Sequence, residues 1–263
     1  MRIRRKKMNE LTFCLPVRID SNDRLNNLLT LLDYFSKYII ARYIILEADT
    51  QSKLQFLSTY SNVKYIYVED SNPIFHRTKY INQMLNLTET PYAAIWDVDA
   101  IVPIKQLFEA YLFLQKDNKS IIVYPFDGKF IPVNSDFSYL FHKQKDIKLF
   151  LCGDMPISFM YGKNCVGGGF LVKVDLYKKC GWENENFIGW GPEDAERYRR
   201  MVILGHMPYR IDGVLYHLYH ERGFNSGLGD DNTAYLTKKE FCKICAMSKD
   251  ELECYVSTWK WIK

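Results

Sequence analysis

The sequence predicts an α/β fold in which a mostly parallel sheet is flanked by helices. Short apolar runs that suit buried strands alternate with amphipathic segments at helical spacing. The connections between them are short, and strand–helix–strand units of this kind pair their strands in parallel. Acidic side chains follow several of the apolar runs, which places them at the edge of the sheet where ligands bind. We therefore expect one ligand site at the carboxyl ends of the strands.

The first part of the chain alternates regularly between the two patterns. The run LTFCLPV suits a buried strand, and the segment after it has leucines at helical spacing, with Ser21 or Asn22 as its cap. The expected order is strand 11–17, helix 25–40, strand 41–48, short helix 53–60, strand 63–68, helix 76–87 and strand 91–96.

The second part continues with longer interruptions. Helix 104–115 and strand 120–125 come first, and the polar, aromatic segment 127–151 is expected to be an insertion or a mobile cover over the site. Strand 166–172 begins with three glycines, which permit either close approach of a ligand or backbone, or simply a flexible turn. The expected remainder is helix 192–205, a strand-like stretch 209–219 and polar helices within 235–263.

Composition bounds the class of protein. The chain has 263 residues, of which 48% are hydrophobic and 15% aromatic, so it can bury a substantial core and disorder is not expected. The net charge of +4 comes largely from basic ends. Such ends allow peripheral contact with an anionic membrane surface, although charge runs are more often simply solvated. No nucleic-acid partner is expected.

The cysteines and the hydropathy indicate the compartment. Seven scattered cysteines favour a reducing compartment over a disulfide framework. Cys242 and Cys245 form a CxxC pair, but no second pair or nearby histidine completes a zinc site, so core packing is expected. The sequence has no apolar run of about 18 residues and no apolar signal core at its start. We therefore expect a cytoplasmic protein.

The stretch from 91 to 102 carries the main chemical signal, because its strand ends on Asp97 and Asp99. Side chains two residues apart on a strand share a face, so both carboxylates can point to one place. Two carboxylates that leave an apolar strand together are costly unless a cation or a polar ligand meets them. Oxygen ligands of this kind suit Mg²⁺ or Mn²⁺, and a solvated turn is the alternative reading of the short motif.

Later residues add candidate ligands and contacts. His217 and His220 are close in sequence in aromatic surroundings; one such histidine is usually structural, but two suggest a metal ligand. Trp190 stands beside Glu193 and Asp194, which fits either a sugar-binding ledge or acids that stabilise a helix start. No G-x-G-x-x-G or G-x-x-x-x-G-K-S/T motif follows any strand, so neither a dinucleotide site nor a P-loop is expected.

The order of these motifs resembles the GT-A-fold nucleotide-sugar glycosyltransferases, including bacterial family 2-like enzymes. The run GWGPED at 189–194 is similar to the W-G-x-E-D motif of β-1,4-galactosyltransferases, polypeptide N-acetylgalactosaminyltransferases and chondroitin-type polymerases. The resemblance implies a single GT-A domain at 11–225, with a basic tail at 1–10 and a helical extension at 226–263. Its nucleotide-binding half would be 11–102 and its acceptor and sugar half 103–225.

The resemblance also implies a role for each candidate residue. Asp97 and Asp99 would bind Mn²⁺ or Mg²⁺ and the nucleotide diphosphate, with Asp99 as the more direct ligand. Either His217 or His220 would complete the metal shell, and His217 is favoured because it lies nearer the strand that enters the site. The residues expected to contact the nucleotide sugar are Pro16, Arg18, Asp20, Glu47, Arg77, Asn82, Asp97, Gly168, Gly169 and Trp190.

The implied reaction is an inverting transfer of a hexose or N-acetylhexosamine, Gal or GalNAc, from a UDP-sugar to a glycan or lipid-linked saccharide. Asp194 would act as the base on the acceptor hydroxyl, and Glu193 would position hydroxyl groups. Because no N-terminal membrane anchor is seen, a bacterial cytoplasmic enzyme of surface-polysaccharide synthesis is expected. Pro192 replaces a glycine of the animal motif, and fewer acids follow Asp194, which leaves the sugar and the acceptor open.

Two other functions fit parts of the pattern. A sugar-phosphate nucleotidyltransferase also combines a metal with an α/β sheet, but it requires a glycine-rich basic loop after the first strand, and residues 15–24 contain no glycine. An inactive glycan-binding module with the same fold would be favoured by the loss of an acid from the D-x-D pair or from positions 193 and 194. All four acids are present.

Overall fold

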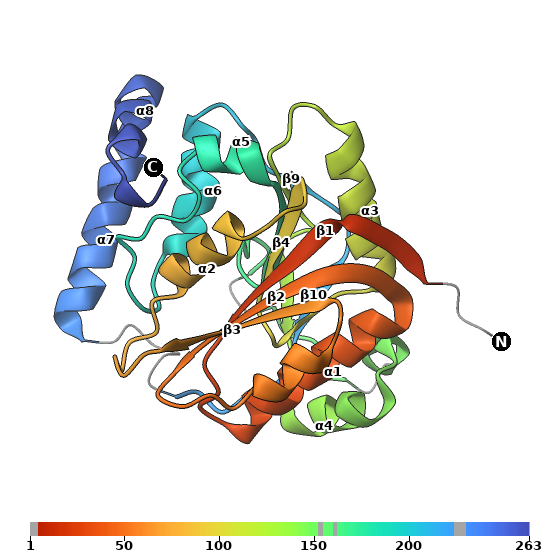
Figure 1. The fold of residues 1–263 in the computed structure, drawn as a ribbon. Helices are drawn as coiled ribbons and strands as arrows, with labels where there is room; N and C mark the ends of the chain where they lie inside the picture. Colours follow the sequence, from red (N-terminus) through yellow and green to blue (C-terminus); the bar gives the residue numbers. More distant parts are fainter. Residues whose placement is uncertain (1–4, 152–154, 160–161, 224–229, 263) are drawn as a thin grey trace.

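Two sheets organise the computed structural model, which describes residues 5–151, 155–159, 162–223 and 230–262 (Figure 1). The larger sheet has the strand order β3-β2-β1-β4-β8-β6-β9, and the smaller has the order β5-β10-β7. The strands are β1 Lys6–Val17, β2 Ile39–Asp49, β3 Val63–Glu69, β4 Tyr92–Trp96, β5 Ala100–Ile101, β6 Ile122–Tyr124, β7 Lys129–Pro132, β8 Gly169–Lys173, β9 Tyr209–Arg210 and β10 Val214–His217.

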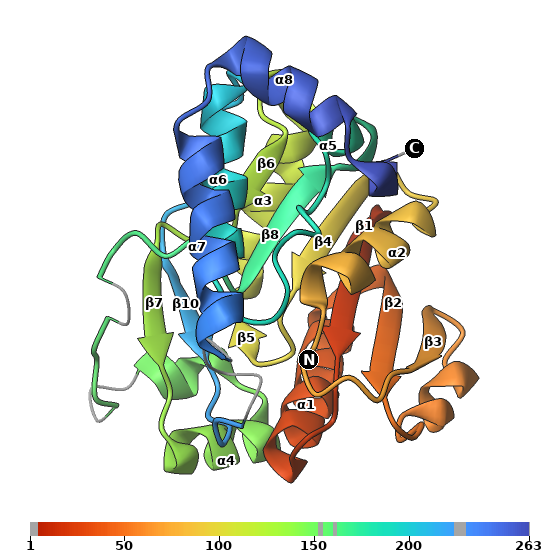
Figure 2. The ribbon, with the colours of Figure 1, turned by 90° about the vertical axis from the view of Figure 1, so that its left-hand side faces the viewer.

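The helices cover both faces of the larger sheet. Those of the α type are α1 Asn22–Tyr38, α2 Arg77–Asn86, α3 Ile104–Lys116, α4 Ser135–Gln144, α5 Val174–Lys179, α6 Glu193–Ile203, α7 Asp231–Cys245 and α8 Lys249–Ser257. Helices α2 and α6 lie on one face, while α1 and α3 lie on the opposite face (Figure 2). Among the described residues, none of the helices is both long and apolar enough to cross a membrane.

The strand directions confirm a mixed, mostly parallel sheet. Strand β1 pairs in parallel with β2 and β4, and β2 pairs in parallel with β3. Strand β8 is antiparallel to both of its neighbours, β4 and β6. The first four strands therefore end at one common edge of the sheet, as expected from the sequence.

Local sequence explains the element boundaries near this edge. Ser21 accepts a hydrogen bond from the backbone of Arg24 at 3.2 Å and so caps α1. Trp96, at the end of β4, is fully buried, and its indole nitrogen donates to the carbonyl of Ala100 at 2.8 Å. This bond closes a tight turn around the two aspartates of the D-x-D motif.

The structure corrects the expected N-terminal tail. Strand β1 begins at Lys6 rather than at Leu11, and Lys6 pairs with Ile39 of β2. Met8 is fully buried within this extension, which a solvated tail would not allow. Residues 1–4 of the expected tail lie outside the described residues, and so does the expected boundary between 225 and 226.

The segment 127–151 is not a loose cover, because it forms β7, α4 and a 3-10 helix at Ile147–Leu151. Phe141 of α4 is fully buried, with its ring centroid 5.5 Å from that of Tyr34 in α1. Strand β7 pairs with β10 in the smaller sheet. The segment had no clear periodicity because these elements are short.

The expected strand 209–219 is two strands that belong to different sheets. Strand β9 pairs with β6 in the larger sheet, whereas β10 pairs with β5 and β7. Gly213 separates them with a φ of +125°, a conformation that other residues rarely adopt. The short helix expected at 53–60 is a 3-10 helix at Gln55–Thr59.

Candidate active site

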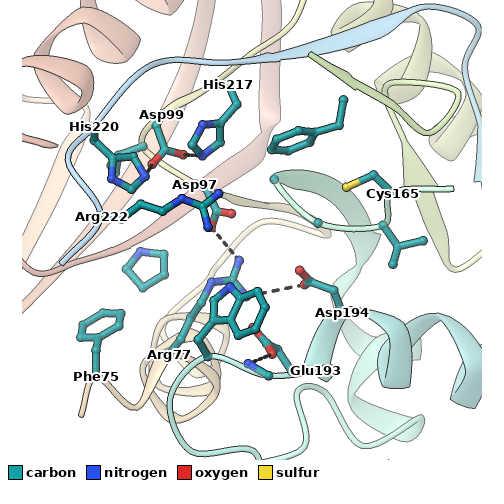
Figure 3. Close-up of a pocket in the computed structure, with 18 of the residues that line it drawn as sticks. Phe75, Arg77, Asp97, Asp99, Cys165, Glu193, Asp194, His217, His220 and Arg222 are labelled. Atoms are coloured by element: carbon teal, nitrogen blue, oxygen red, sulfur yellow. Dashed lines mark hydrogen bonds and ion pairs between the residues drawn. The ribbon is translucent and has the colours of Figure 1, made fainter. Parts of the chain in front are cut away.

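A pocket of about 440 Å³ opens at the carboxyl ends of β1 and β4. The loop before β8, the start of α6 and the residues after β10 complete its walls (Figure 3). Most of the predicted site residues line it: Pro16, Arg18, Asp20, Arg77, Asp97, Asp99, Gly168, Trp190, Glu193, Asp194, His217 and His220. Elements far apart in the sequence therefore bring these side chains together.

Asp99, His217 and His220 form one cluster on a wall of the pocket. Strand pairing aligns His217 with Ala100, the neighbour of Asp99, and the backbone of Leu218 donates to the Asp99 carbonyl at 2.8 Å. The Nε2 atoms of His217 and His220 lie 3.4 and 3.3 Å from different oxygens of the Asp99 carboxylate. Potential ligand atoms of the three residues all lie within 4.8 Å of one another.

The chemistry of this cluster fits a divalent cation. Asp99 is 4% exposed, and its Oδ1 is a buried oxygen without a hydrogen-bond partner among the described residues. Burial lowers the pKa of His217, which favours the neutral imidazole that binds metals. Burial alone would raise the pKa of Asp99, but the two imidazoles and the guanidinium of Arg24 hold it below its usual value. One carboxylate and two imidazoles are a donor set for divalent transition-metal ions, of which Mn²⁺ suits the carboxylate and Fe²⁺ or Zn²⁺ suits the imidazoles.

The structure brings both histidines to Asp99, so the geometry does not favour His217 over His220 as the expected ligand. Asp97, the fourth predicted ligand, lies outside this cluster. Its Oδ1 accepts a hydrogen bond from Arg77 Nη2 at 2.7 Å. Burial raises the pKa of Asp97 despite this partner. Arg77 therefore lies between Asp97 and Asp194 and contacts both carboxylates.

Glu193 and Asp194 face the pocket from the first turn of α6 (Figure 3). Glu193 Oε2 accepts a hydrogen bond from the backbone of Gly191 at 3.0 Å. Burial, together with the charge of Asp194, raises the pKa of the Glu193 carboxyl to about 8, so Glu193 is protonated at neutral pH. The two adjacent acids therefore differ in what they can do.

The two carboxylate oxygens of Asp194 have different surroundings. Its Oδ1 lies 2.8 Å from Arg197 Nη2 and 3.9 Å from Arg77 Nη1. Its Oδ2 lies directly over Gly167, where even a methyl group would overlap it. Asp194 is 29% exposed, so the carboxylate can reach a ligand in the pocket. Such a carboxylate can accept a proton from a bound hydroxyl group.

The three glycines at the start of β8 allow the backbone to approach the D-x-D turn closely, as the sequence suggested. Gly168 has a φ of +87°, and its carbonyl accepts a hydrogen bond from the backbone of Asp97 at 2.9 Å. A Cβ at Gly169 would lie 2.7 Å from the Trp96 ring. The three glycines therefore fix the loop at the start of β8 against the D-x-D turn. The alternative expectation, a flexible turn, is wrong.

Three residues expected to contact a nucleotide sugar lie outside the pocket lining: Glu47, Asn82 and Gly169. Glu47 is fully buried and accepts hydrogen bonds from the backbone of Lys53 and Leu54. The amide of Asn82 bonds with both backbone groups of Glu183. Their polar groups are occupied within the protein, and Gly169 faces Trp96. We correct these assignments accordingly.

Arg18 lines the pocket, but most of its donors serve the loop after β3. It donates to the carbonyls of Ala48 and Asn72 at 2.8 and 2.7 Å and pairs with Asp70 at 2.6 Å. Its guanidinium also lies 5.4 Å from the centroid of the Phe75 ring. This arrangement sets Phe75 at the pocket as an aromatic wall.

The sequence did not single out several residues that line the pocket: Arg24, Phe75, Cys165 and Arg222. Arg24 lies 3.9 Å from Asp99 and 2.9 Å from Asp20, in the first turn of α1. Its position shortly after the first strand, at the edge of the sheet where ligands bind, could have identified Arg24 as a site residue. Phe75 and Arg222 stand in irregular segments whose course the sequence pattern does not predict.

Comparisons with known proteins show which sequences the chain resembles. No protein-family model matches the sequence. Beta-1,4-galactosyltransferase 7 of Homo sapiens is 28% identical over 102 residues, which cover 39% of this chain and 31% of that protein. The Mus musculus protein of the same name gives the same identity and coverage. The match thus spans about a third of the length of these curated relatives.

Solved structures share the fold. The catalytic domain of Drosophila beta1,4galactosyltransferase 7 in complex with xylobiose has a TM-score of 0.54 and 15% identity, covering 92% of this chain and 84% of its own. S. aureus TarS 1-349 has a TM-score of 0.59 and 13% identity, covering 93% and 68%. A mutant of the Drosophila enzyme with manganese, UDP-Gal and xylobiose has a TM-score of 0.46 and 15% identity, covering 77% and 65%. The two structures with TM-scores of 0.54 and 0.59 show that the chain has the GT-A fold that its motifs implied.

Proposed function

We propose that this protein is a metal-dependent glycosyltransferase that moves a sugar from a UDP-sugar to a saccharide acceptor with inversion. One observation carries the proposal: a carboxylate–dihistidine cluster and a carboxylate held by arginine face the same pocket. The cluster fits the cation that a diphosphate leaving group requires, and the carboxylate fits the base that an acceptor hydroxyl requires.

Each wall of the pocket has a task in this reaction. Asp99, His217 and His220 would hold Mn²⁺, which when bound supplies positive charge to the diphosphate of the leaving group. Phe75 offers an aromatic face for the uracil ring, and the half-exposed Trp190 offers an apolar face for a sugar ring. The guanidinium groups of Arg24 and Arg77 add positive charge along the path between them.

The proton transfer falls to the two acids at the start of α6. Asp194 Oδ2 takes the proton from the acceptor hydroxyl as that oxygen attacks the anomeric carbon and the bond to the diphosphate breaks. Glu193 is protonated at neutral pH and has a hydrogen to donate to a sugar hydroxyl. No covalent enzyme intermediate is required, because a single displacement inverts the anomeric centre.

The relatives guide the finer part of the proposal. The curated relatives are named as galactosyltransferases, which supports Gal or the similar GalNAc as the donor sugar. The structure with xylobiose supports a saccharide acceptor, either a glycan or a lipid-linked saccharide. We propose a nucleotide-binding half at 11–102, extended at its start by the first residues of β1 from Lys6, and a sugar and acceptor half at 103–225. We also propose that the protein is a bacterial cytoplasmic enzyme of surface-polysaccharide synthesis that contacts the membrane peripherally.

A donor screen tests the proposal. Purified protein is incubated with a panel of nucleotide sugars, with and without Mn²⁺, and release of the nucleotide diphosphate is measured in the presence and absence of short saccharides. We expect Mn²⁺-dependent release from UDP-Gal or UDP-GalNAc that a saccharide accelerates. Binding of saccharides without turnover of any donor would instead indicate a glycan-binding module, and release of pyrophosphate from a nucleoside triphosphate would indicate a nucleotidyltransferase.

A further inference from the structure

Arg197 lies directly behind Asp194 and is buried completely. It stands one helical turn after Asp194 on α6, so its side chain passes on the same side of the helix. Its Nη2 lies 2.8 Å from Asp194 Oδ1. The guanidinium carbon lies 4.1 Å from the centroid of the Phe170 ring, which supports the group from one face.

Glu183 fixes the orientation of this guanidinium. Arg197 donates from Nε to one oxygen of Glu183 at 2.8 Å and from Nη2 to the other at 2.9 Å. This two-pronged contact determines both the position and the plane of the group. The Arg197 charge and its hydrogen bonds overcome the effect of burial and lower the pKa of Glu183 to about 2, so the pair stays charged.

Glu183 is itself held in place by two other side chains. The Tyr177 hydroxyl donates to Glu183 Oε1 at 2.6 Å, and the Asn82 amide bonds with the Glu183 backbone in both directions. Glu183 is 1% exposed and lies outside the pocket lining. A rigid chain of contacts thus runs from the protein interior to one oxygen of Asp194.

We infer that Arg197, oriented by Glu183, is a positioning residue for the carboxylate of Asp194. The inference rests on the proposed function, in which Asp194 takes the acceptor proton. The ion pair between Oδ1 and Arg197 restricts the rotation of the carboxylate and leaves Oδ2 beside Gly167 at the pocket. Displacement of a reacting group by about 1 Å can cost a factor of about 100 in rate, so this constraint matters for turnover.

Arg200 provides a matched comparison on the same helix. It is also completely buried, and it pairs with Glu196 at 2.7 Å. Its other donors bond with the carbonyls of Cys180 and Trp182, away from the pocket. A conservative change at Arg200 therefore disturbs a buried ion pair of α6 without touching Asp194.

The test compares Arg197→Lys, Glu183→Asp and the control Arg200→Lys in the full chain. Lysine at position 197 keeps the positive charge but cannot make both hydrogen bonds to Glu183. Aspartate at position 183 is shorter by one methylene, so the guanidinium of Arg197 must shift away from Asp194 to keep its hydrogen bonds. We expect the single-turnover rate of sugar transfer to fall about 10- to 100-fold in both Arg197→Lys and Glu183→Asp. The affinity for the UDP-sugar should stay within about twofold, because neither residue lines the pocket.

Arg200→Lys should lower the melting temperature without changing the transfer rate of the folded protein. Equal transfer rates in folded Arg197→Lys, Arg200→Lys and wild type would overturn the inference, and so would a parallel loss of donor affinity. Where Arg197→Lys does not fold, Glu183→Asp decides by the same two criteria. Absence of any donor turnover by wild type would count against the proposed function instead.

Discussion

At the scale of single residues, Asp194 and Glu193 show how the environment separates two adjacent acids. Glu193 is 7% exposed, and its carboxyl group contacts the Gly191 backbone. Asp194 is 29% exposed and faces two arginines and the pocket. Burial keeps Glu193 protonated near neutral pH, whereas the open carboxylate of Asp194 suits proton abstraction.

Changing Asp194 to Asn should separate catalysis from donor binding. The variant keeps the size of the side chain but removes the base, so turnover should fall by roughly 10² to 10⁴. The proposed base would contact neither the nucleotide nor the cation, and UDP-sugar affinity should therefore be nearly unchanged. Steady-state transfer assays and donor titrations measure the two quantities. Near wild-type transfer by folded protein would move the base role to Glu193 or exclude this mechanism.

The pKa of Glu193 predicts how stability depends on pH. Between the ordinary value of 4.5 and about 8, the folded protein holds a proton that the unfolded chain has released. The free energy of unfolding should therefore fall as the pH rises through this window, by up to about 1.4 kcal/mol per pH unit. Glu193→Gln removes this titration, so its urea-unfolding curves should depend less on pH. Identical pH dependence in the two proteins would show that Glu193 ionises normally.

The two histidines should contribute comparably to metal binding. Both imidazoles lie at nearly the same distance from the Asp99 carboxylate. We expect His217→Ala and His220→Ala each to raise the Mn²⁺ concentration for half-maximal activity by about 10- to 100-fold. Manganese titrations of activity measure this shift, with His206→Ala as the control because His206 lies outside the pocket. An unchanged titration for either variant would remove that histidine from the metal shell.

At the scale of elements, the pocket depends on how closely the loop before β8 approaches α6. Gly167 leaves room for Asp194 Oδ2, and Gly168 accepts the backbone hydrogen bond of Asp97. The same loop thus lies against Asp194 and against the D-x-D turn. Helices α7 and α8 support the loop before α6 from outside, since Glu240 accepts hydrogen bonds from Asn184 and Tyr255.

Gly167→Ala should impair transfer more than stability. The new methyl group would overlap Asp194 Oδ2 and turn this part-exposed carboxylate away from its ion pair with Arg197. We expect the transfer rate to fall about 100-fold, with a small change in melting temperature. Adding Gly167→Ala to Asp194→Asn should then cost little more. Fully additive losses would mean that the methyl group acts on something other than Asp194.

At the scale of the whole molecule, the sequence was sufficient for the larger sheet and for most of the pocket. Strand edges were predictable because the apolar runs of β1 to β4 are followed by polar residues at or just after the end of each strand. The smaller sheet was not, because β5 has only two residues and β7 and β10 have four each, which is too short to show a periodicity. Glu47 looked like a ligand because strand position does not reveal that its carboxylate bonds with the backbone of the next turn.

Arg197 shows a second limit of sequence reasoning. A basic residue one turn into a helix is usually solvated, and only the packing of Glu183 and Phe170 around it reveals a buried contact with Asp194. The histidines were predicted as a pair, but their joint approach to Asp99 depends on the pairing of β10 with β5. The pattern of residues in the sequence therefore does not specify contacts between elements that lie far apart in the chain.

Calorimetric titration of UDP into the protein, with and without Mn²⁺, tests the central claim most directly. The claim is that the Asp99 cluster holds the cation that binds the diphosphate. Wild type should bind UDP tightly only with Mn²⁺, and Asp99→Ala should lose that Mn²⁺-dependent affinity while keeping its melting temperature within a few degrees. UDP affinity that is the same in both proteins, with and without Mn²⁺, would contradict the account.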